Sequence, residues 1–279
     1  MVVFAGQGDI RRSLALLWRI PAANSERTAP GPKPALSVDV IVDAGIAIAD
    51  ASGISAVSMR EVGRRLGRTG MALYTYVPSK DELVDLMYDR SLAELPTAYA
   101  TDAGWRPALA AWMRDYWAFC LRHPWTLQVS QARPVLGPHE NTMLETLVGI
   151  LYTTGLPART LRRVVGTLVN HVRGAAQTVV DTRQATAATG VTDDAWWSAR
   201  SAAFAELVPD FAERFPTVVR LAREAAAESG SPAESGPPAD AERPYLEQVA
   251  TDTFDLGLAV LLDGLEAMVR RDQPLAGRT

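Results

Sequence analysis

Five basic side chains lie within residues 57–80, although the whole chain of 279 residues has a formal net charge of −4. Glu61 is the only acid of this segment, and its basic residues are Arg60, Arg64, Arg65, Arg68 and Lys80. Guanidinium and ammonium groups bind phosphate oxygens, so their concentration on one small segment predicts a nucleic-acid-binding surface. The alternative is a small helical subdomain with a solvated basic face.

The same segment has the pattern of a helix-turn-helix, which would hold these cations in place. Ser58 and Glu61 fit a capping box at the start of the first helix, and Ser79 and Glu82 fit another just after the unit. The crossing of the two helices requires a small residue at the position where Gly63 stands. The spacing therefore predicts two short, closely packed helices.

The turn between the two helices is expected at Gly67, because that position requires a positive φ. Arg68 follows at a position that is usually apolar, which predicts a turn more exposed than usual. The first helix is expected to end near Leu66, and the second to cover Gly70–Val77. The inward-facing positions are expected to be Val62, Leu66, Leu73 and Tyr76.

Helical periodicity continues over the rest of the chain, without an internal repeat or a regular run of alternating strands. Prolines fall near the edges of the expected helices, where they are tolerated. The sequence therefore predicts an all-α protein, with further helices over 36–52, 79–95, 105–122, 140–154, 158–181, 194–207, 211–228 and 244–271.

Composition and motifs exclude several other classes of protein. Hydrophobic residues make up 48% of the chain and charged residues 22%, which is the balance of a globular protein with a sizeable core. Cys120 is the single cysteine, so an intrachain disulfide framework and a multi-cysteine zinc site are excluded. We expect no metal, no cofactor, no signal peptide and no membrane span. Common catalytic motifs are absent, so we expect a cytoplasmic protein that is not an enzyme.

Specific motifs occur in three stretches, Leu36–Val42, Ala56–Gly67 and Met71–Leu83. Together with the helix that follows, to about residue 95, they resemble the DNA-binding domain of TetR-family transcriptional regulators. The later part of the chain is similar to the tetracycline-repressor type of ligand-binding and dimerisation domain, above all in residues 105–125, 156–177 and 254–266.

This resemblance implies a sequence-specific transcriptional repressor, which a small-molecule ligand releases from a palindromic operator in double-stranded DNA. Two alternatives stay open. One is a transcriptional activator of the same fold, and the other is a ligand-binding or interaction protein that has lost DNA binding.

The resemblance also implies DNA contacts for nine residues. Thr69, Gly70 and Met71, at the start of the recognition helix, would face base edges in the major groove. The hydroxyls of Tyr74 and Tyr76 would bind phosphates, with core packing as the alternative for both rings. The remaining contacts, chiefly to the DNA backbone, would come from Ser58, Arg60, Arg68 and Lys80.

A ligand pocket is predicted in the second domain. Trp112, Tyr116 and Phe119 recur at three- and four-residue spacing, so they share one helix face, which is either core or the wall of a pocket. In the family, this helix lines a ligand cavity. The polar residues that would orient an aromatic or lipophilic effector are Gln128, Asn170, Arg173 and Gln177, with a solvated stripe as the alternative.

A homodimer is expected, with helices 158–181 and 244–271 of each copy forming a four-helix bundle. The last helix has more apolar surface than one intramolecular face needs, and its candidate interface residues are Leu258, Leu261, Leu262, Leu265 and Met268. Such a dimer would hold its recognition helices about 34–36 Å apart, which matches a palindromic site.

Three domains are predicted along the chain. Residues 1–35 are expected to be a flexible basic arm that contains a short helix between Asp9 and Arg19 and either contacts phosphates or is solvated. Residues 36–80 form the DNA-binding domain. Residues 81–279 form the ligand-binding and dimerisation domain, with a disordered loop at about 229–243.

Overall fold

The computed structural model describes residues 3–4, 6–20, 36–229 and 245–272, which belong to two compact units. Unit 1 comprises the residues up to Ala176 and from Gly257 onward, and unit 2 comprises Gln177–Leu256. The predicted linker before residue 36 and nearly all of the predicted loop at 229–243 lie outside the described residues. The domain boundaries given above stay a prediction.

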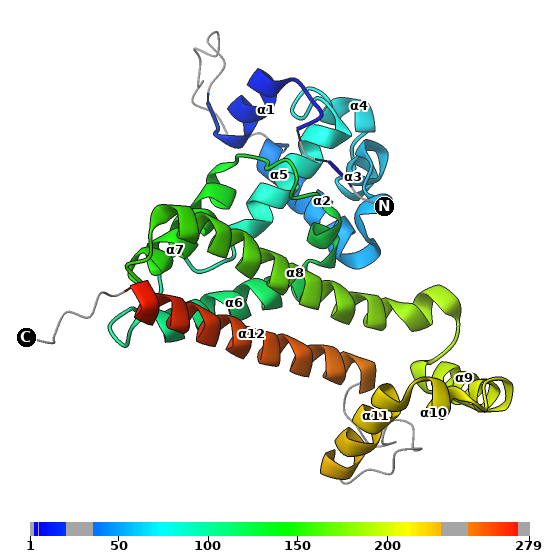
Figure 1. Ribbon diagram of the computed structural model, residues 1–279. Coiled ribbons are helices and arrows are strands. Elements are labelled where there is room, and N and C mark those ends of the chain that lie inside the picture. Colours follow the sequence, from blue (N-terminus) through cyan, green and yellow to red (C-terminus); the bar gives the residue numbers. More distant parts are fainter. Residues whose placement is uncertain (1–2, 5, 21–35, 230–244, 273–279) are drawn as a thin grey trace, which may run out of the picture. The chain divides into compact units, whose positions relative to one another are not determined.

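Helices make up all regular elements of the described residues, and a single β-bridge joins Val3 to Val129, so the predicted all-α fold is confirmed (Figure 1). Among the described helices, none combines the length and hydropathy that a bilayer crossing requires. Unit 1 contains, wholly or in part, α1 (Ile10–Leu17), α2 (Val38–Ser52), η1 (Ile54–Ala56), α3 (Met59–Arg65), α4 (Gly70–Leu73), α5 (Lys80–Leu92), α6 (Trp105–Arg122), η2 (Pro124–Gln128), α7 (Pro138–Tyr152), α8 (Ala158–Thr189) and α12 (Tyr245–Asp272).

The N-terminal helix α1 packs against α5. Asp9 caps it by accepting a hydrogen bond at 2.8 Å from a backbone amide of the first turn, and Leu17 is buried. Trp18 Nε1 donates to the Leu136 carbonyl at 2.9 Å. The expected short helix is therefore present, but residues 6–20 are a packed part of unit 1 rather than a flexible arm, because their apolar face and polar groups find partners there.

Serine caps begin the helices that carry the basic segment. The Ser58 hydroxyl accepts from the Glu61 amide at 3.1 Å, and the Ser79 hydroxyl accepts from the Asp81 amide at 3.1 Å and the Glu82 amide at 3.3 Å. In a complete capping box, the glutamate side chain accepts from the backbone amide of the serine, and in both predicted boxes the glutamate has another partner instead. The Glu61 carboxylate is held by a neighbouring guanidinium, and the Glu82 carboxylate accepts from the Ser79 hydroxyl.

One continuous set of apolar side chains holds unit 1 together. The first four α-helices after α1 bury apolar residues, and α6, α7, α8 and α12 bury further ones. Fully or almost fully buried members of this core include Ile41, Val62, Leu73, Leu83, Met87, Leu109, Met113, Leu147, Val172 and Leu258.

Unit 2 contains parts of α8 and α12 together with α9 (Asp193–Leu207), α10 (Phe211–Arg214) and α11 (Pro216–Ser229). Arg183 Nη2 donates to Glu247 Oε1 at 2.7 Å within this unit. The single helix predicted over 211–228 is divided at Phe215, because Pro216 has no amide hydrogen to continue a helix and instead begins the next one.

Candidate functional site

Helices α3 and α4 approach each other closely at Gly63. A Cβ at this residue would lie 2.8 Å from the Arg68 carbonyl oxygen and 2.9 Å from the Gly70 nitrogen, so no side chain fits. Gly67 turns the chain with a φ of +64°, and the Arg68 amide donates to the Gly63 carbonyl at 2.8 Å. The turn therefore depends on both glycines, as the sequence predicts.

The helix-turn-helix presents a row of exposed side chains to solvent. The second helix, α4, ends at Leu73 rather than at the predicted Val77. Met71 on α4 is 77% exposed and Tyr74, directly after it, is 43% exposed, so this segment offers one apolar and one hydroxyl-bearing side chain. Tyr76 is half-buried. The other exposed residues among the predicted DNA contacts are Ser58, Arg60, Arg68, Thr69 and Lys80. Their contact with DNA stays a prediction.

Gly70 lies where the start of α4 meets the start of α3. A Cβ on it would lie 3.2 Å from the Met59 carbonyl oxygen and 3.3 Å from the Arg60 Cα. The start of α4 thus rests closely against the start of α3 at Gly70. Thr69 and Met71, on either side of it, are exposed. Base contacts by all three residues stay a prediction.

Arg64 is engaged within α3. Its Nε donates to Glu61 Oε2 at 2.9 Å, and this hydrogen bond lowers the pKa of the Glu61 carboxyl and raises the pKa of Arg64. Both side chains are solvent-accessible, so the pair contributes little to stability. Arg60 and Arg68 extend exposed guanidinium groups from the same helix-turn-helix, which is the geometry that phosphate contacts need.

An aromatic stack fills the buried face of α6, as the residue spacing predicts. Ring centroids lie 5.3 Å apart between Trp112 and Tyr116 and 6.1 Å apart between Tyr116 and Phe119. Each of the three side chains is at most 1% exposed, so they belong to the core of unit 1 in this structure. Core packing was one of the two expectations for them.

Arg173 extends from α8 to the same aromatic stack. Its Nη2 donates to the carbonyls of Thr126 at 3.2 Å, Leu127 at 3.1 Å and Val129 at 3.0 Å. The buried Tyr116 hydroxyl lies beside the same guanidinium and interacts with it. Of the seven predicted ligand residues, Tyr116 and Arg173 are therefore the two whose polar groups lie next to each other.

The other polar ligand candidates do not join Arg173. Asn170 is exposed, and Gln177 Nε2 donates at 2.7 Å to Asp181 Oδ1 within unit 2. Gln128 is half-buried, and its carbonyl accepts from the Val3 amide at 2.9 Å. Spacings of three and four residues place side chains on one broad helix face, but they do not show which of them turns inward.

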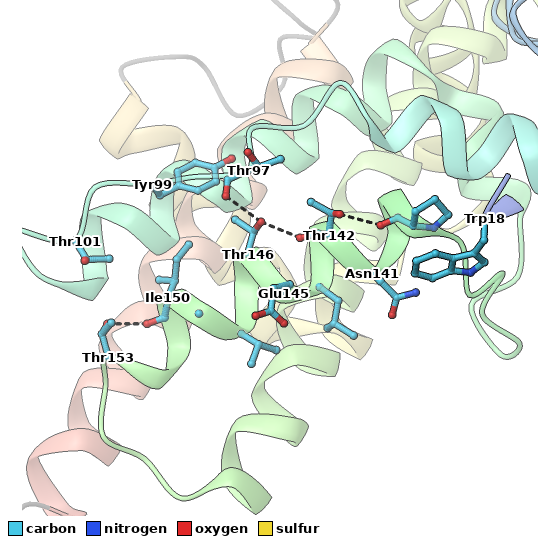
Figure 2. A pocket seen from close by; sticks show the side chains of 14 residues that line it. Trp18, Thr97, Tyr99, Thr101, Asn141, Thr142, Glu145, Thr146, Ile150 and Thr153 are labelled. Atoms are coloured by element: carbon cyan, nitrogen blue, oxygen red, sulfur yellow. Dashed lines mark hydrogen bonds between the residues drawn. The ribbon is translucent and has the colours of Figure 1, made fainter. Parts of the chain in front are cut away.

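A pocket of about 940 Å³ opens between α7 and residues 97–101, with Trp18 at one end (Figure 2). Tyr99 donates its hydroxyl to Asp115 Oδ2 at 2.7 Å, and Thr146 Oγ1 donates to the Thr97 carbonyl at 3.3 Å. None of the predicted ligand residues lines this pocket. No pattern in the sequence predicts this pocket, because one wall is an irregular segment and Trp18 reaches it only through the packing of α1.

A second groove, of about 360 Å³, lies between α8 and α12 within unit 1. It is lined by three of the predicted dimer residues and by the exposed Val260. Leu258 and Leu262 do not line it and are buried within the protomer, at 2% and 5% exposed. The place of all five residues at a dimer interface stays a prediction. The three predicted residues that line the groove are Leu261, Leu265 and Met268.

Two family models match this chain. Residues 41–87 match bacterial regulatory proteins of the tetR family, and residues 98–234 match the tetracyclin repressor-like C-terminal domain. The chain is also 37% identical over 267 residues to the HTH-type transcriptional repressor DrrR1 of Streptomyces coeruleorubidus, covering 95% of this chain and 88% of that protein. The chain belongs to the TetR family. It is a helix-turn-helix DNA-binding transcriptional regulator and not an enzyme.

Solved structures have the same fold. ActR of Streptomyces coelicolor in complex with actinorhodin superposes with a TM-score of 0.63 at 24% identity, covering 86% of this chain and 99% of that one. Apo ActR gives a TM-score of 0.62 at 23% identity, with the same coverage of both chains. At this level of identity the likeness concerns the fold alone.

Proposed function

We propose that this protein is a homodimeric repressor that binds a palindromic operator and leaves it when a small molecule binds. The observation that carries the proposal is the exposed face of the helix-turn-helix. Met71 and Tyr74 project from α4, and exposed cations lie on α3, in the turn and at the start of α5. Side chains beside the start of a recognition helix read bases in the major groove, while flanking cations bind phosphates.

Dimerisation is proposed through the groove between α8 and α12. Val260 is 60% exposed beside it, and a Cβ on Gly166 or Gly264 would meet no atom within 4 Å, so this surface has room for a second pair of helices. A two-fold axis would give each subunit the same contacts. It would place the two recognition helices about 34–36 Å apart, which requires two inverted half-sites in the DNA.

Repression rather than activation is proposed because DrrR1, which is similar over most of its length, is named a repressor. Release by a ligand is proposed because the helical part beyond the helix-turn-helix matches the tetracyclin repressor-like C-terminal domain and contains a buried aromatic stack beside Arg173. A ligand that favours the conformation unable to bind DNA must weaken DNA affinity by its differential affinity for the two conformations. We place the protein in the cytoplasm, with its operator.

Selection from random double-stranded DNA tests the proposal, at about 100–150 mM salt because phosphate contacts weaken steeply with salt. We expect a palindromic consensus. Lys80→Ala should weaken binding to every sequence and reduce the salt slope by about one, whereas Met71→Ala should relax the consensus. Arg220→Ala, an exposed arginine on α11, is the matched control and should change neither property.

Weak binding without a consensus, from a protein that is still dimeric, would contradict the proposal and favour the ligand-binding or interaction protein. A reporter gene placed behind the selected operator then separates the two remaining alternatives. A repressor lowers its transcription, and an activator raises it.

A further inference from the structure

We propose that an organic ammonium ion binds the α7 pocket, the pocket of about 940 Å³ between α7 and residues 97–101 (Figure 2). The ion would place its nitrogen at Glu145 and its apolar or aromatic body against Trp18. This inference goes beyond the proposed function, because binding at the α7 pocket requires neither DNA nor a second copy of the chain.

The first argument is the charge of the α7 pocket. Among the described residues that line it, Glu145 is the only charged one, and it is exposed. The described part of the chain offers this carboxylate no ion-pair partner. A second carboxylate, that of Asp115, accepts the hydrogen bond of the Tyr99 hydroxyl at 2.7 Å. Two carboxylates without a lining cation make the pocket electronegative, which favours a cationic ligand.

The second argument is the hydrogen-bond chemistry of the wall. Six side-chain donors that line the pocket already donate to acceptors of the protein, which leaves only the hydroxyls of Thr97 and Thr101 as further lining donors. The oxygens of the bonded hydroxyls keep free lone pairs, and the Asn141 amide oxygen and the Glu145 carboxylate can only accept. The wall therefore matches a ligand that donates, as an ammonium group does with its N–H bonds. The six bonded donors belong to Trp18, Tyr99, Asn141, Thr142, Thr146 and Thr153.

The third argument is the apolar surface at one end of the pocket. Trp18 is 48% exposed, and its Nε1 donates to the Leu136 carbonyl at 2.9 Å, so a fixed indole ring has about half of its surface open. Indole is the aromatic side chain that interacts best with cations and with flat apolar groups. Trp18 lies at the end of the pocket where Asn141 is (Figure 2). Asn141 and Glu145 are one helical turn apart, about 6 Å along the axis, so a short carbon link should join the ring and the nitrogen of the ligand.

The position of Trp18 gives binding a structural consequence. Trp18 directly follows α1, which packs against α5. A ligand held between Trp18 and α7 would add to the contacts that keep α1 in place. Because such a ligand binds only the folded chain, it should raise the melting temperature with increasing ligand concentration.

Isothermal titration calorimetry with 2-phenylethylammonium and 2-phenylethanol tests the proposal on the full chain. The two probes have nearly the same size and shape, but the alcohol has no charge and one donor instead of three. We expect the ammonium to bind about three- to tenfold more tightly than the alcohol, as for an ion pair at an exposed site. This preference should shrink as the salt concentration rises.

Variants assign the binding to the α7 pocket. Glu145→Gln keeps the shape of the side chain and should lower the affinity for the ammonium to that for the alcohol, without changing the melting temperature of the protein alone. Trp18→Leu should weaken both probes about three- to tenfold, because both lose the ring contact. Glu206→Gln, the same change at an exposed residue of α9 that does not line the pocket, is the control and should leave both affinities unchanged.

Three results would overturn the proposal. The first is absence of 2-phenylethylammonium binding at millimolar concentration. The second is equal affinity of the wild type for both probes, which would show that the pocket does not select a cation. The third is a preference for the ammonium that persists in Glu145→Gln, which would place the bound cation at another site.

Discussion

Asp50 and Trp125 are joined by a hydrogen bond in which the indole Nε1 donates to the carboxylate Oδ1 at 2.8 Å. The same oxygen lies 2.7 Å from the Nδ1 of His123. Asp50 is on α2, the first helix of the DNA-binding segment, and Trp125 is in η2, after the aromatic stack of α6. One carboxylate therefore connects the DNA-binding helices to the part of unit 1 in which we propose ligand binding.

Asp50→Ala should lower the free energy of unfolding by about 1–3 kcal/mol, because the donor of the buried Trp125 ring loses its acceptor. Asp43→Ala is the matched control on the same helix. Asp43 is exposed and pairs with Arg90 at 3.4 Å, so its loss should change stability by about 0–1 kcal/mol. Urea unfolding measures both variants, and equal effects would show that the bond to Trp125 contributes nothing specific.

Gly63→Ala should disrupt the helix-turn-helix and abolish operator binding. The added Cβ would meet backbone atoms of residues 68–70 at 2.8–3.0 Å, and backbone cannot rotate away as a side chain can. Gly149→Ala on α7 is the control, because its Cβ would meet no atom within 4 Å. That change should raise stability by about 0.5–1 kcal/mol through helix propensity.

Thermal melting and operator affinity distinguish the two glycine variants. If Gly63→Ala bound the operator as tightly as the wild type, the close crossing of α3 and α4 would not be required for DNA binding.

The parts of the fold that the sequence predicts well are those fixed by local chemistry. Ser58 caps a helix, Gly67 supplies a positive φ and Gly63 permits a crossing, and each requirement involves residues close together in the chain. The aromatic stack of α6 was also predictable, because three- and four-residue spacing is a property of the helix itself. Whether that stack faces a ligand depends on the neighbouring helices, so the residue spacing on α6 does not decide it.

The features that could not be predicted depend on long-range packing. Helical spacing groups Asn170, Arg173 and Gln177, but only the position of α6 decides that Arg173 meets Tyr116. The docking of the N-terminal residues on α5 depends on contacts between residues distant in sequence, such as that of the Gly6 amide with Asp85, 79 residues away. The interaction of the Arg173 guanidinium with the buried Tyr116 hydroxyl is a property of the assembled core, which no local pattern records.

Leu17→Ala should loosen α1 from α5 and lower the free energy of unfolding by about 2–5 kcal/mol at most, because Leu17 is 5% exposed and its truncation leaves a cavity. Ile10→Ala on the same helix is the control, since Ile10 is 72% exposed. Hydrogen exchange of the Val3 and Gly6 amides, which are bonded to Gln128 and Asp85, reports local detachment. Unchanged exchange in Leu17→Ala would show that the N-terminal residues dock independently of α1.

Stability should depend on pH through Asp85 on α5. Burial raises the pKa of this carboxyl from 3.8 to about 6, against the opposing effect of the Gly6 amide, which donates to Oδ2 at 3.0 Å. Negative charge on Glu82, Asp81 and Glu140 raises it further. An acid whose pKa is raised by folding stabilises the protein fully below its unfolded pKa, and this stabilisation is lost as pH rises through the folded pKa.

The contribution of Asp85 should therefore decline between pH 3.8 and about 6. In Asp85→Asn, which stays neutral and keeps an acceptor for the Gly6 amide, this decline is removed. The free energy of unfolding of the variant relative to the wild type should rise across that window by about 2–3 kcal/mol at most. Buried Asp89 and half-buried Glu140 also have raised pKa values, but they are present in both proteins, so their own titration largely cancels in the difference. Asp252→Asn, exposed on α12 and not among the charges that raise the pKa of Asp85, should keep the wild-type slope. Urea unfolding at a series of pH values provides the measurement, and parallel curves for Asp85→Asn and the wild type would contradict the prediction.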